Sequence, residues 1–267
     1  MKLCFSTLGC TEKTICESLS LARARGFDAI EIRGVGGVMN NSDIPAFYRQ
    51  NATETKKLFE ENSVYPLVLG TSCKFHTEEN IGKAMVEGKE SILIASRFGI
   101  PYIRVFGNNI TDLRDECIAG VIRGIKELCD FADGKNVTVL LEVHGDFNTV
   151  EALTPIIEEL GGNRSFGILW DIAHSHRVYR ENWQVFYEFI RPYIKHVHIK
   201  DVSDENKALT DIGKGDIPII QIVERMLSDG YNGYFSLEWE RKWHPELDAV
   251  EVALKYFTEI MGKCRQS

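Results

Sequence analysis

The chain lacks long hydrophobic runs and paired cysteines. None of its apolar segments approaches the roughly 20 residues that a membrane-spanning helix needs. Its first ten residues, MKLCFSTLGC, lack the basic and long apolar segments of a signal peptide. The seven cysteines are an odd number, and none belongs to a Cys-x-x-Cys pair. These absences argue against a membrane protein, a disulfide-stapled fold and a zinc–thiolate site, and they predict a cytoplasmic protein.

Positive charge and nucleotide-binding motifs are also scarce. The formal net charge of −8 disfavours contact with phosphate backbones, so we expect no nucleic-acid partner. No Gly-x-Gly-x-x-Gly motif follows the first apolar run, so a dinucleotide-binding fold has no fingerprint here. The composition is that of a globular protein, with 44% hydrophobic residues, and no low-complexity linker divides it. We therefore predict a single domain over residues 1–267.

Short apolar runs alternate with amphipathic segments along the whole chain. The predicted strands are residues 2–7, 29–33, 65–70, 102–107, 137–143, 166–171, 195–200 and 234–239. Helical patterns follow them at 12–25, 46–62, 79–98, 113–132, 149–160, 181–190, 219–226 and 250–261. The clearest apolar stripe consists of Leu113, Cys117, Val121, Ile125, Leu128 and Ala132. Eight strand–helix units in a chain of this length predict an α/β fold, the (β/α)8 TIM barrel, with an open doubly wound sheet as the alternative.

Polar residues gather at the ends of the last four predicted strands. In a (β/α)8 barrel these ends form one half of the mouth, where functional sites lie. One inward-facing residue from each strand gives Glu142, Asp171, His198 and Glu238. His196 shares a face with His198 but lies deeper, which indicates a supporting role. Any one of these residues alone is more often a paired or solvated group, so the prediction depends on all four together.

The predicted cluster combines three carboxylates with one imidazole. Three carboxylates packed together repel one another unless a cation neutralises them, which predicts one divalent metal ion. Oxygen-rich ligation with a single imidazole suits Mn²⁺, Co²⁺ or Mg²⁺ better than a structural Zn²⁺. Mn²⁺ is favoured, and Zn²⁺ stays among the alternatives.

Several motifs give the chain a resemblance to a known superfamily. They are GFDAIEIRG, LLEVHGD, WDIAH, HVHIKD, DIGKGDIP and FSLEWERKWHPE, in the same order as in that superfamily. On these motifs the sequence resembles the xylose isomerase-like TIM barrels, which include sugar and sugar-phosphate isomerases and epimerases, inosose dehydratases and apurinic endonucleases. The resemblance extends over most of the chain.

The resemblance implies a metal-dependent isomerase or epimerase that moves a proton next to a carbonyl. In the related epimerases the ligands are Glu, Asp, His and Glu from the fifth to eighth strands, which correspond here to Glu142, Asp171, His198 and Glu238. By the same resemblance Glu142 and Glu238 form the acid/base pair, and the metal stabilises an enediolate. His174 corresponds to a histidine that holds a substrate oxygen.

Four further residues are predicted to contact a carbohydrate substrate: His144, Lys200, His76 and Trp243. His144 is either an extra base or substrate contact, or a rim histidine bonded to Asp146. Trp243 follows the eighth strand and either stacks on a sugar ring or contacts another subunit. Barrels of this kind form oligomers, so the resemblance implies a homodimer or a homotetramer.

Two departures narrow the predicted substrate. Ketose 3-epimerases carry a Glu six residues after the first ligand, where this chain has Asn148, which we interpret as a helix N-cap. They also carry an Arg shortly after the strand-seven His, and residues 199–206 contain none. These departures argue against a free-ketohexose epimerase. The alternatives are a dehydratase of an inosose or keto-sugar and, less favoured, an apurinic endonuclease or a non-catalytic sugar-binding barrel.

Overall fold

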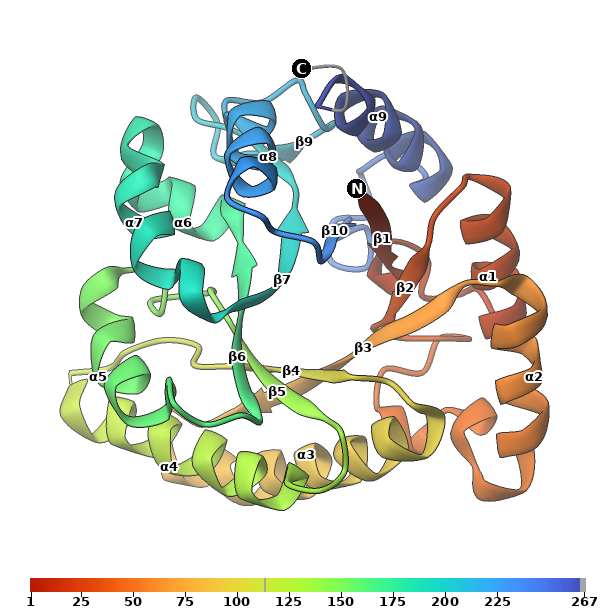
Figure 1. Cartoon of the computed structure of the whole chain (residues 1–267), viewed down its shortest axis with the longest axis horizontal. Coiled ribbons are helices and arrows are strands. Elements are labelled where there is room, and N and C mark those ends of the chain that lie inside the picture. Colours follow the sequence, from red (N-terminus) through yellow and green to blue (C-terminus); the bar gives the residue numbers. More distant parts are fainter. Residues whose placement is uncertain (113, 265–267) are drawn as a thin grey trace.

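A computed structural model describes residues 1–112 and 114–264, and within them the strands close into a parallel barrel surrounded by helices (Figure 1). The order around the barrel is β1-β10-β7-β6-β5-β4-β3-β2. This arrangement confirms the predicted (β/α)8 architecture. The barrel strands are β1 (Lys2–Ser6), β2 (Ala29–Ile32), β3 (Tyr65–Lys74), β4 (Tyr102–Phe106), β5 (Thr138–Glu142), β6 (Phe166–Asp171), β7 (Ile194–Ile199) and β10 (Tyr234–Leu237).

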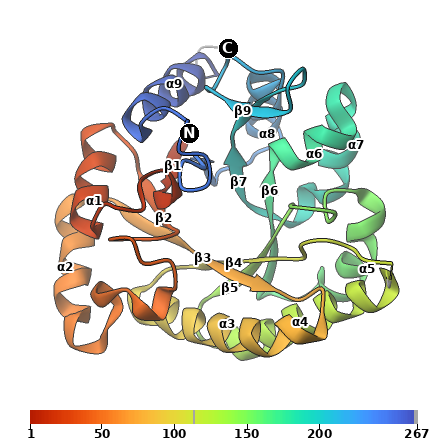
Figure 2. The ribbon, with the colours of Figure 1, turned by 180° about the vertical axis from the view of Figure 1, so that it is seen from behind.

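The helices form the outer layer around the strands, as both ribbon views show (Figures 1 and 2). They are α1 (Ile15–Ala24), α2 (Ala52–Asn62), α3 (Glu78–Phe98), α4 (Arg114–Ala132), α5 (Val150–Leu160), α6 (Ile172–Tyr179), α7 (Trp183–Ile190), α8 (Ile219–Ser228) and α9 (Val250–Lys263). On α4 the predicted apolar stripe is buried from Cys117 to Ala132. Leu113, its first member, lies outside the described residues.

Alternation along the strands sends large apolar side chains outward and polar ones into the barrel. On β6 the indole of Trp170 stacks on Tyr187 of α7, with the ring centroids 5.4 Å apart, and donates a hydrogen bond to Ser175. The next residue, Asp171, faces the opposite side, because successive strand side chains alternate. It lies beside His198 in the register of β6 and β7. The register thus places two predicted ligands at the same level of the barrel.

Two elements differ from the prediction. The sequence analysis predicted no helix directly after β6, but the segment there forms the helix α6, in which His176 is buried. Between β7 and α8 a small antiparallel hairpin is formed by β8 (Asp201–Ser203) and β9 (Ala208–Thr210). Both elements follow barrel strands and lie beside the mouth. They were missed because each is too short to give a clear periodicity.

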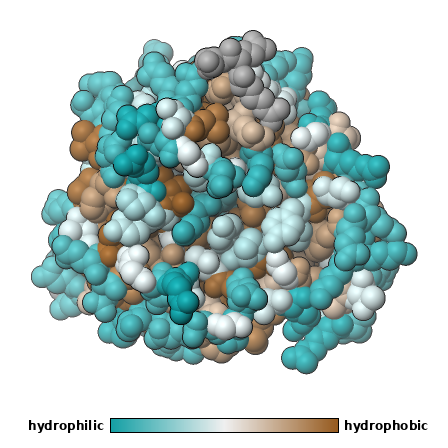
Figure 3. Space-filling model, in the orientation of Figure 1, coloured by the Kyte–Doolittle hydropathy of each residue, from teal (hydrophilic) through white to brown (hydrophobic). Residues whose placement is uncertain are grey.

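The outer surface is largely hydrophilic on the face shown in Figure 3, with hydrophobic residues in small separate groups. Among the described residues no helix has both the length and the apolar character that a membrane span requires. All seven cysteines have free thiols, and six of them are buried. Buried thiols behave as small apolar side chains, which agrees with their positions in the core.

Candidate metal centre

The four predicted ligands come together at the carboxyl ends of their strands. Glu142 ends β5, Asp171 ends β6, His198 lies near the end of β7, and Glu238 follows β10 directly. One potential ligand atom from each residue lies within 4.8 Å of the others, and all four side chains are buried. The structure therefore brings together the set predicted from the sequence, and its role in metal binding stays a prediction.

Asp171 has two separate tasks, one for each of its carboxylate oxygens. Its Oδ1 accepts hydrogen bonds from the backbone N–H groups of Ala173, at 2.9 Å, and His174, at 3.3 Å, and so caps α6. Its Oδ2 faces the cluster and lies 2.8 Å from the Lys200 Nζ. Burial raises the pKa of Asp171 to about 6, although the Lys200 ammonium opposes the shift.

His198 provides the observation that best fits a metal ion. Its Nδ1 has no hydrogen-bond partner and lies 3.4 Å from Glu142 Oε1, 3.4 Å from Glu238 Oε2 and 3.9 Å from Asp171 Oδ2. Its Nε2 lies 2.9 Å from Glu31 Oε2. Burial lowers the pKa of His198, but Glu238 and Glu31 outweigh burial and hold it well above its usual value. This unpartnered nitrogen and the three carboxylates that it faces together form a donor set that suits a divalent cation.

Glu142 is held by Arg104, a residue that the sequence analysis did not single out. The Arg104 Nε lies 3.1 Å from Glu142 Oε2, and both side chains are buried. Burial raises the pKa of Glu142, but Arg104 and His198 together outweigh burial and leave the pKa below its usual value. Gly70 makes room for the guanidinium, because a Cβ there would lie 3.1 Å from Arg104 and 2.6 Å from Arg33. The available signal was a lone charged residue in the apolar strand YIRVF.

Lys200 lies inside the cluster and not at its edge. Its ammonium is 2.8 Å from Asp171 Oδ2 and 2.5 Å from Glu238 Oε2, and it also contacts the carboxylate of Glu240. Burial lowers the pKa of Lys200, but these carboxylates outweigh it and raise the pKa well above its usual value. The predicted substrate contact is therefore a buried cation beside three acidic groups, and the raised pKa keeps it protonated.

The two predicted imidazoles of the mouth lie against each other. The ring centroids of His144 and His174 are 4.1 Å apart, and the His144 ring also packs on Phe106. Burial lowers the pKa of both histidines, that of His174 strongly, so both are neutral at neutral pH. Their Nδ1 atoms have no hydrogen-bond partner. Asp146, the alternative partner of His144, instead accepts a hydrogen bond from the Ile110 N–H at 2.8 Å.

Asn148 does not cap α5 as predicted. The N-cap is Thr149, whose side chain accepts a hydrogen bond from the Ala152 N–H. The Asn148 amide donates a hydrogen bond of 3.0 Å to the backbone carbonyl of His174. Asn148, where the chain departs from the ketose 3-epimerase pattern, therefore holds the backbone of His174, the predicted substrate-binding histidine, through this hydrogen bond.

His76 and Trp243 lie further from the cluster. The ring Nε2 of His76 is 3.2 Å from the side-chain amide of Asn108 at the end of β4. The side chain of Trp243 is 56% exposed in the loop after β10. Its neighbour His244 instead lines a cavity of about 220 Å³ together with His174, Lys200 and Glu240. The cavity lies beside the candidate centre through Lys200, which contacts Asp171 and Glu238, and Ala208 and Leu209 of the β8–β9 hairpin line its wall.

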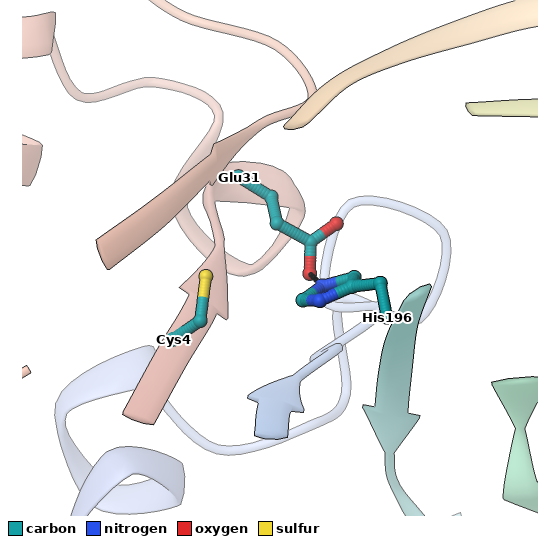
Figure 4. Close-up of side chains that lie close together, drawn as sticks. All are labelled: Cys4, Glu31 and His196. Atoms are coloured by element: carbon teal, nitrogen blue, oxygen red, sulfur yellow. Dashed lines mark hydrogen bonds and ion pairs between the residues drawn. The ribbon is translucent and has the colours of Figure 1, made fainter. Parts of the chain in front are cut away.

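A second group of potential ligands, Cys4, Glu31 and His196, lies deeper in the barrel (Figure 4). Its members come from β1, β2 and β7, and all are buried. His196 Nε2 lies 2.8 Å from Glu31 Oε1, which also accepts a hydrogen bond from the Ser236 hydroxyl. The sequence predicted the supporting position of His196 but not the part played by Glu31.

Comparison with known proteins identifies the family. The model of the xylose isomerase-like TIM barrel family matches residues 19–260, so the chain belongs to this family. An uncharacterized protein of Methanocaldococcus jannaschii, MJ1311, is 27% identical over 147 residues. This match covers 52% of the present chain and 48% of that protein, so it spans about half of each.

Several solved structures share the fold at low sequence identity. A probable 3-DHS dehydratase, AsbF, of petrobactin synthesis in Bacillus anthracis has a TM-score of 0.79 at 17% identity and covers 97% of this chain and 99% of its own. An IolI protein with a bound zinc atom has a TM-score of 0.79 at 21% identity, with 99% and 98% covered. A D-tagatose 3-epimerase-like protein has the same TM-score and identity, with 100% and 97% covered.

Proposed function

We propose that this protein is a divalent-metal-dependent isomerase or epimerase that moves a proton next to the carbonyl of a sugar or sugar derivative. The observation that carries the proposal is the buried set of Glu142, Asp171, His198 and Glu238, with ligand atoms within 4.8 Å of one another. The similar fold of the IolI protein with a bound zinc atom and of the epimerase-like protein supports it. Mn²⁺ remains our preferred ion because the donor set is rich in oxygen.

Glu142 and Glu238 are the proposed acid and base. Each has a carboxylate oxygen 3.4 Å from His198 Nδ1, so the two groups border one small space. Both pKa values lie below the usual range, which keeps the carboxylates ionised and able to accept a proton. A bound divalent ion would supply Lewis acidity that makes a C–H next to a carbonyl easier to deprotonate. His174 and Lys200 line the adjoining cavity and would hold substrate oxygens.

A dehydratase is the second candidate, and the position of Lys200 favours it. In this reaction a base takes the proton next to the carbonyl, and a hydroxyl on the following carbon leaves as water after it receives a proton. The neutral His144 can act as the base and then return that proton to the leaving hydroxyl, to which the Lys200 ammonium can donate a hydrogen bond. The similar fold of the probable 3-DHS dehydratase supports this candidate.

Deuterium incorporation tests the proposal. The protein is stripped of metal with a chelator, restored with Mn²⁺, Co²⁺ or Mg²⁺, and incubated in D₂O with a panel of aldoses, ketoses, inososes and other keto-sugars, free and phosphorylated. Metal-dependent deuterium at the carbon next to the carbonyl, without loss of water, supports an isomerase or epimerase. Loss of water supports the dehydratase. If neither deuterium incorporation nor loss of water occurs with any of the substrates and metals, the proposal is contradicted.

Three predictions on the surroundings of the site complete the proposal. We propose a small carbohydrate as the partner, a homodimer or homotetramer as the assembly, and the cytoplasm as the compartment. The free thiols of all seven cysteines support a reducing compartment. Sedimentation equilibrium of the purified protein measures the assembly, and a monomer at all concentrations would contradict it.

A further inference from the structure

We infer that Glu31 is a positioning residue, which fixes the ring of His198 so that Nδ1 is the nitrogen presented to the metal. The inference extends the proposed function, on which it rests for the presence of a metal. Glu31 lies on β2 and His198 on β7, strands that are not neighbours in the barrel. Their contact therefore crosses the barrel interior and joins residues 167 positions apart in the sequence.

The argument begins with the two oxygens of Glu31. Oε1 lies 2.8 Å from the His196 Nε2, and Oε2 lies 2.9 Å from the His198 Nε2. An ionised carboxylate can only accept hydrogen bonds, so each Nε2 must carry a hydrogen. The hydrogen on the His198 Nε2 leaves its Nδ1 as the atom that can bind a cation. This Nδ1 is the atom that faces the three carboxylates of the cluster.

Burial makes this arrangement stiff. Glu31 is 3% exposed, and His196 and His198 are fully buried, so water cannot replace the hydrogen bonds. Because His196 and His198 alternate on β7, they present their rings to the same side of the strand, and one carboxylate reaches both. The Ser236 hydroxyl adds a further hydrogen bond to Oε1. Carboxylates that hold a ligating histidine in this way typically contribute about 10- to 100-fold to metal affinity.

The same contacts argue against a second metal ion between Cys4, Glu31 and His196. The oxygens of Glu31 are already engaged by two imidazoles and a hydroxyl. Burial raises the pKa of the Cys4 thiol well above its usual value, whereas a metal ligand must be a thiolate. The deeper group is therefore a support for the metal centre above it.

Metal binding to three variants tests the inference. Glu31→Gln replaces one of the two accepting oxygens with an NH2 donor, so one of the two imidazole hydrogen bonds is lost. We expect it to bind Mn²⁺ about 10- to 100-fold more weakly than the wild-type protein, by isothermal titration calorimetry. Glu31→Asp keeps the acceptor but is shorter, and we expect an intermediate affinity. Cys4→Ala, the matched control, removes a neighbour of Glu31 without touching His198, and we expect wild-type affinity and one ion per chain.

Nitrogen NMR of the wild-type protein provides a test that needs no variant, should Glu31→Gln fail to fold. With ¹⁵N-labelled histidine and bound Zn²⁺, we expect the His198 Nδ1 to be metal-bound and its Nε2 to be protonated. Coordination through Nε2, unchanged affinity in Glu31→Gln, or loss of a second ion in Cys4→Ala would each overturn the inference and leave the proposed function standing. A wild-type protein that binds no divalent ion would overturn both.

Discussion

Two layers of buried polar residues lie in the barrel interior, and they differ in how fully their hydrogen-bonding groups are satisfied. At the mouth, the His198 Nδ1 has no hydrogen-bond partner and faces three carboxylates. One layer deeper, both oxygens of Glu31 accept hydrogen bonds from His196, His198 and Ser236. Of these four side chains, the His196 Nδ1, which faces away from Glu31, is the one unpartnered buried atom outside the mouth cluster. A similar set of residue types can therefore form a site open to a ligand or a closed support. The number of unpaired atoms distinguishes the two better than the residue types do.

The largest expected effect is on catalysis at the mouth. Glu142→Gln keeps the shape of the side chain but removes the base, so proton exchange should fall by about 100- to 10,000-fold. Deuterium incorporation into the best substrate measures the loss. Glu158→Gln on the exposed side of α5 is the control and should retain full exchange. Unchanged exchange in Glu142→Gln would refute the assigned role of Glu142.

The next largest effect is expected on the free energy of unfolding, at Arg104, which contacts Glu142 in the layer at the mouth. Arg104→Met leaves the buried Glu142 carboxylate without its cation, and we expect the metal-free protein to lose about 3–5 kcal/mol. Saturating Mn²⁺ should reduce this loss, because the ion supplies the missing positive charge. Urea unfolding with and without Mn²⁺ measures both values. Arg164→Met, an exposed control, should stay within about 0.5 kcal/mol of the wild-type protein.

A variant of the deeper layer should behave differently. His196→Phe removes one donor to Glu31 and should destabilise the protein by about 1–3 kcal/mol. Because His198 keeps its own hydrogen bond to Glu31, the loss should be the same with and without Mn²⁺. The same urea series measures it. A loss that depends on Mn²⁺ would mean that the two layers do not differ in the way described.

The last expected effect is a pH dependence of the metal-free protein. The pKa of Asp171 is raised to about 6 in the folded state, so the folded protein binds a proton more tightly than the unfolded chain. Its contribution to stability is therefore fully present below about pH 4 and is lost as the pH rises to about 6. The slope should reach at most about 1.4 kcal/mol per pH unit in chelator-treated protein. Asp171→Asn should lack this slope, and an equal slope in both proteins would contradict the assignment.

The sequence allowed prediction of the barrel and of the ligand set for the same reason. Strand alternation and the position of strand ends are local properties, and they place Glu142, Asp171, His198 and Glu238 together once the barrel closes. Glu31 and Arg104 could not be assigned, because each is a single charged residue within an apolar strand whose partner is distant in the sequence. Glu31 and His196 are 165 positions apart.

Short elements account for the remaining differences. The α6 helix has eight residues, and each strand of the β8–β9 hairpin has three, too few for a periodic pattern to emerge. The cap of α5 shifted by one residue, from Asn148 to Thr149, because both residue types suit an N-cap and only tertiary contacts decide between them. The predicted stacking of Trp243 depends on a substrate and stays a prediction.

The carboxylate of Asp171 connects the helix α6 to the candidate metal centre, because each of its oxygens contacts one of them. One oxygen stabilises the first turn of α6, and the other faces the cluster where an ion would draw on its charge. That first turn carries His174, the histidine against the cavity. Binding of an ion to the cluster would therefore change the charge on the carboxylate that caps α6, the helix that carries His174. Ion occupancy and substrate recognition would then be mechanically coupled through a single side chain.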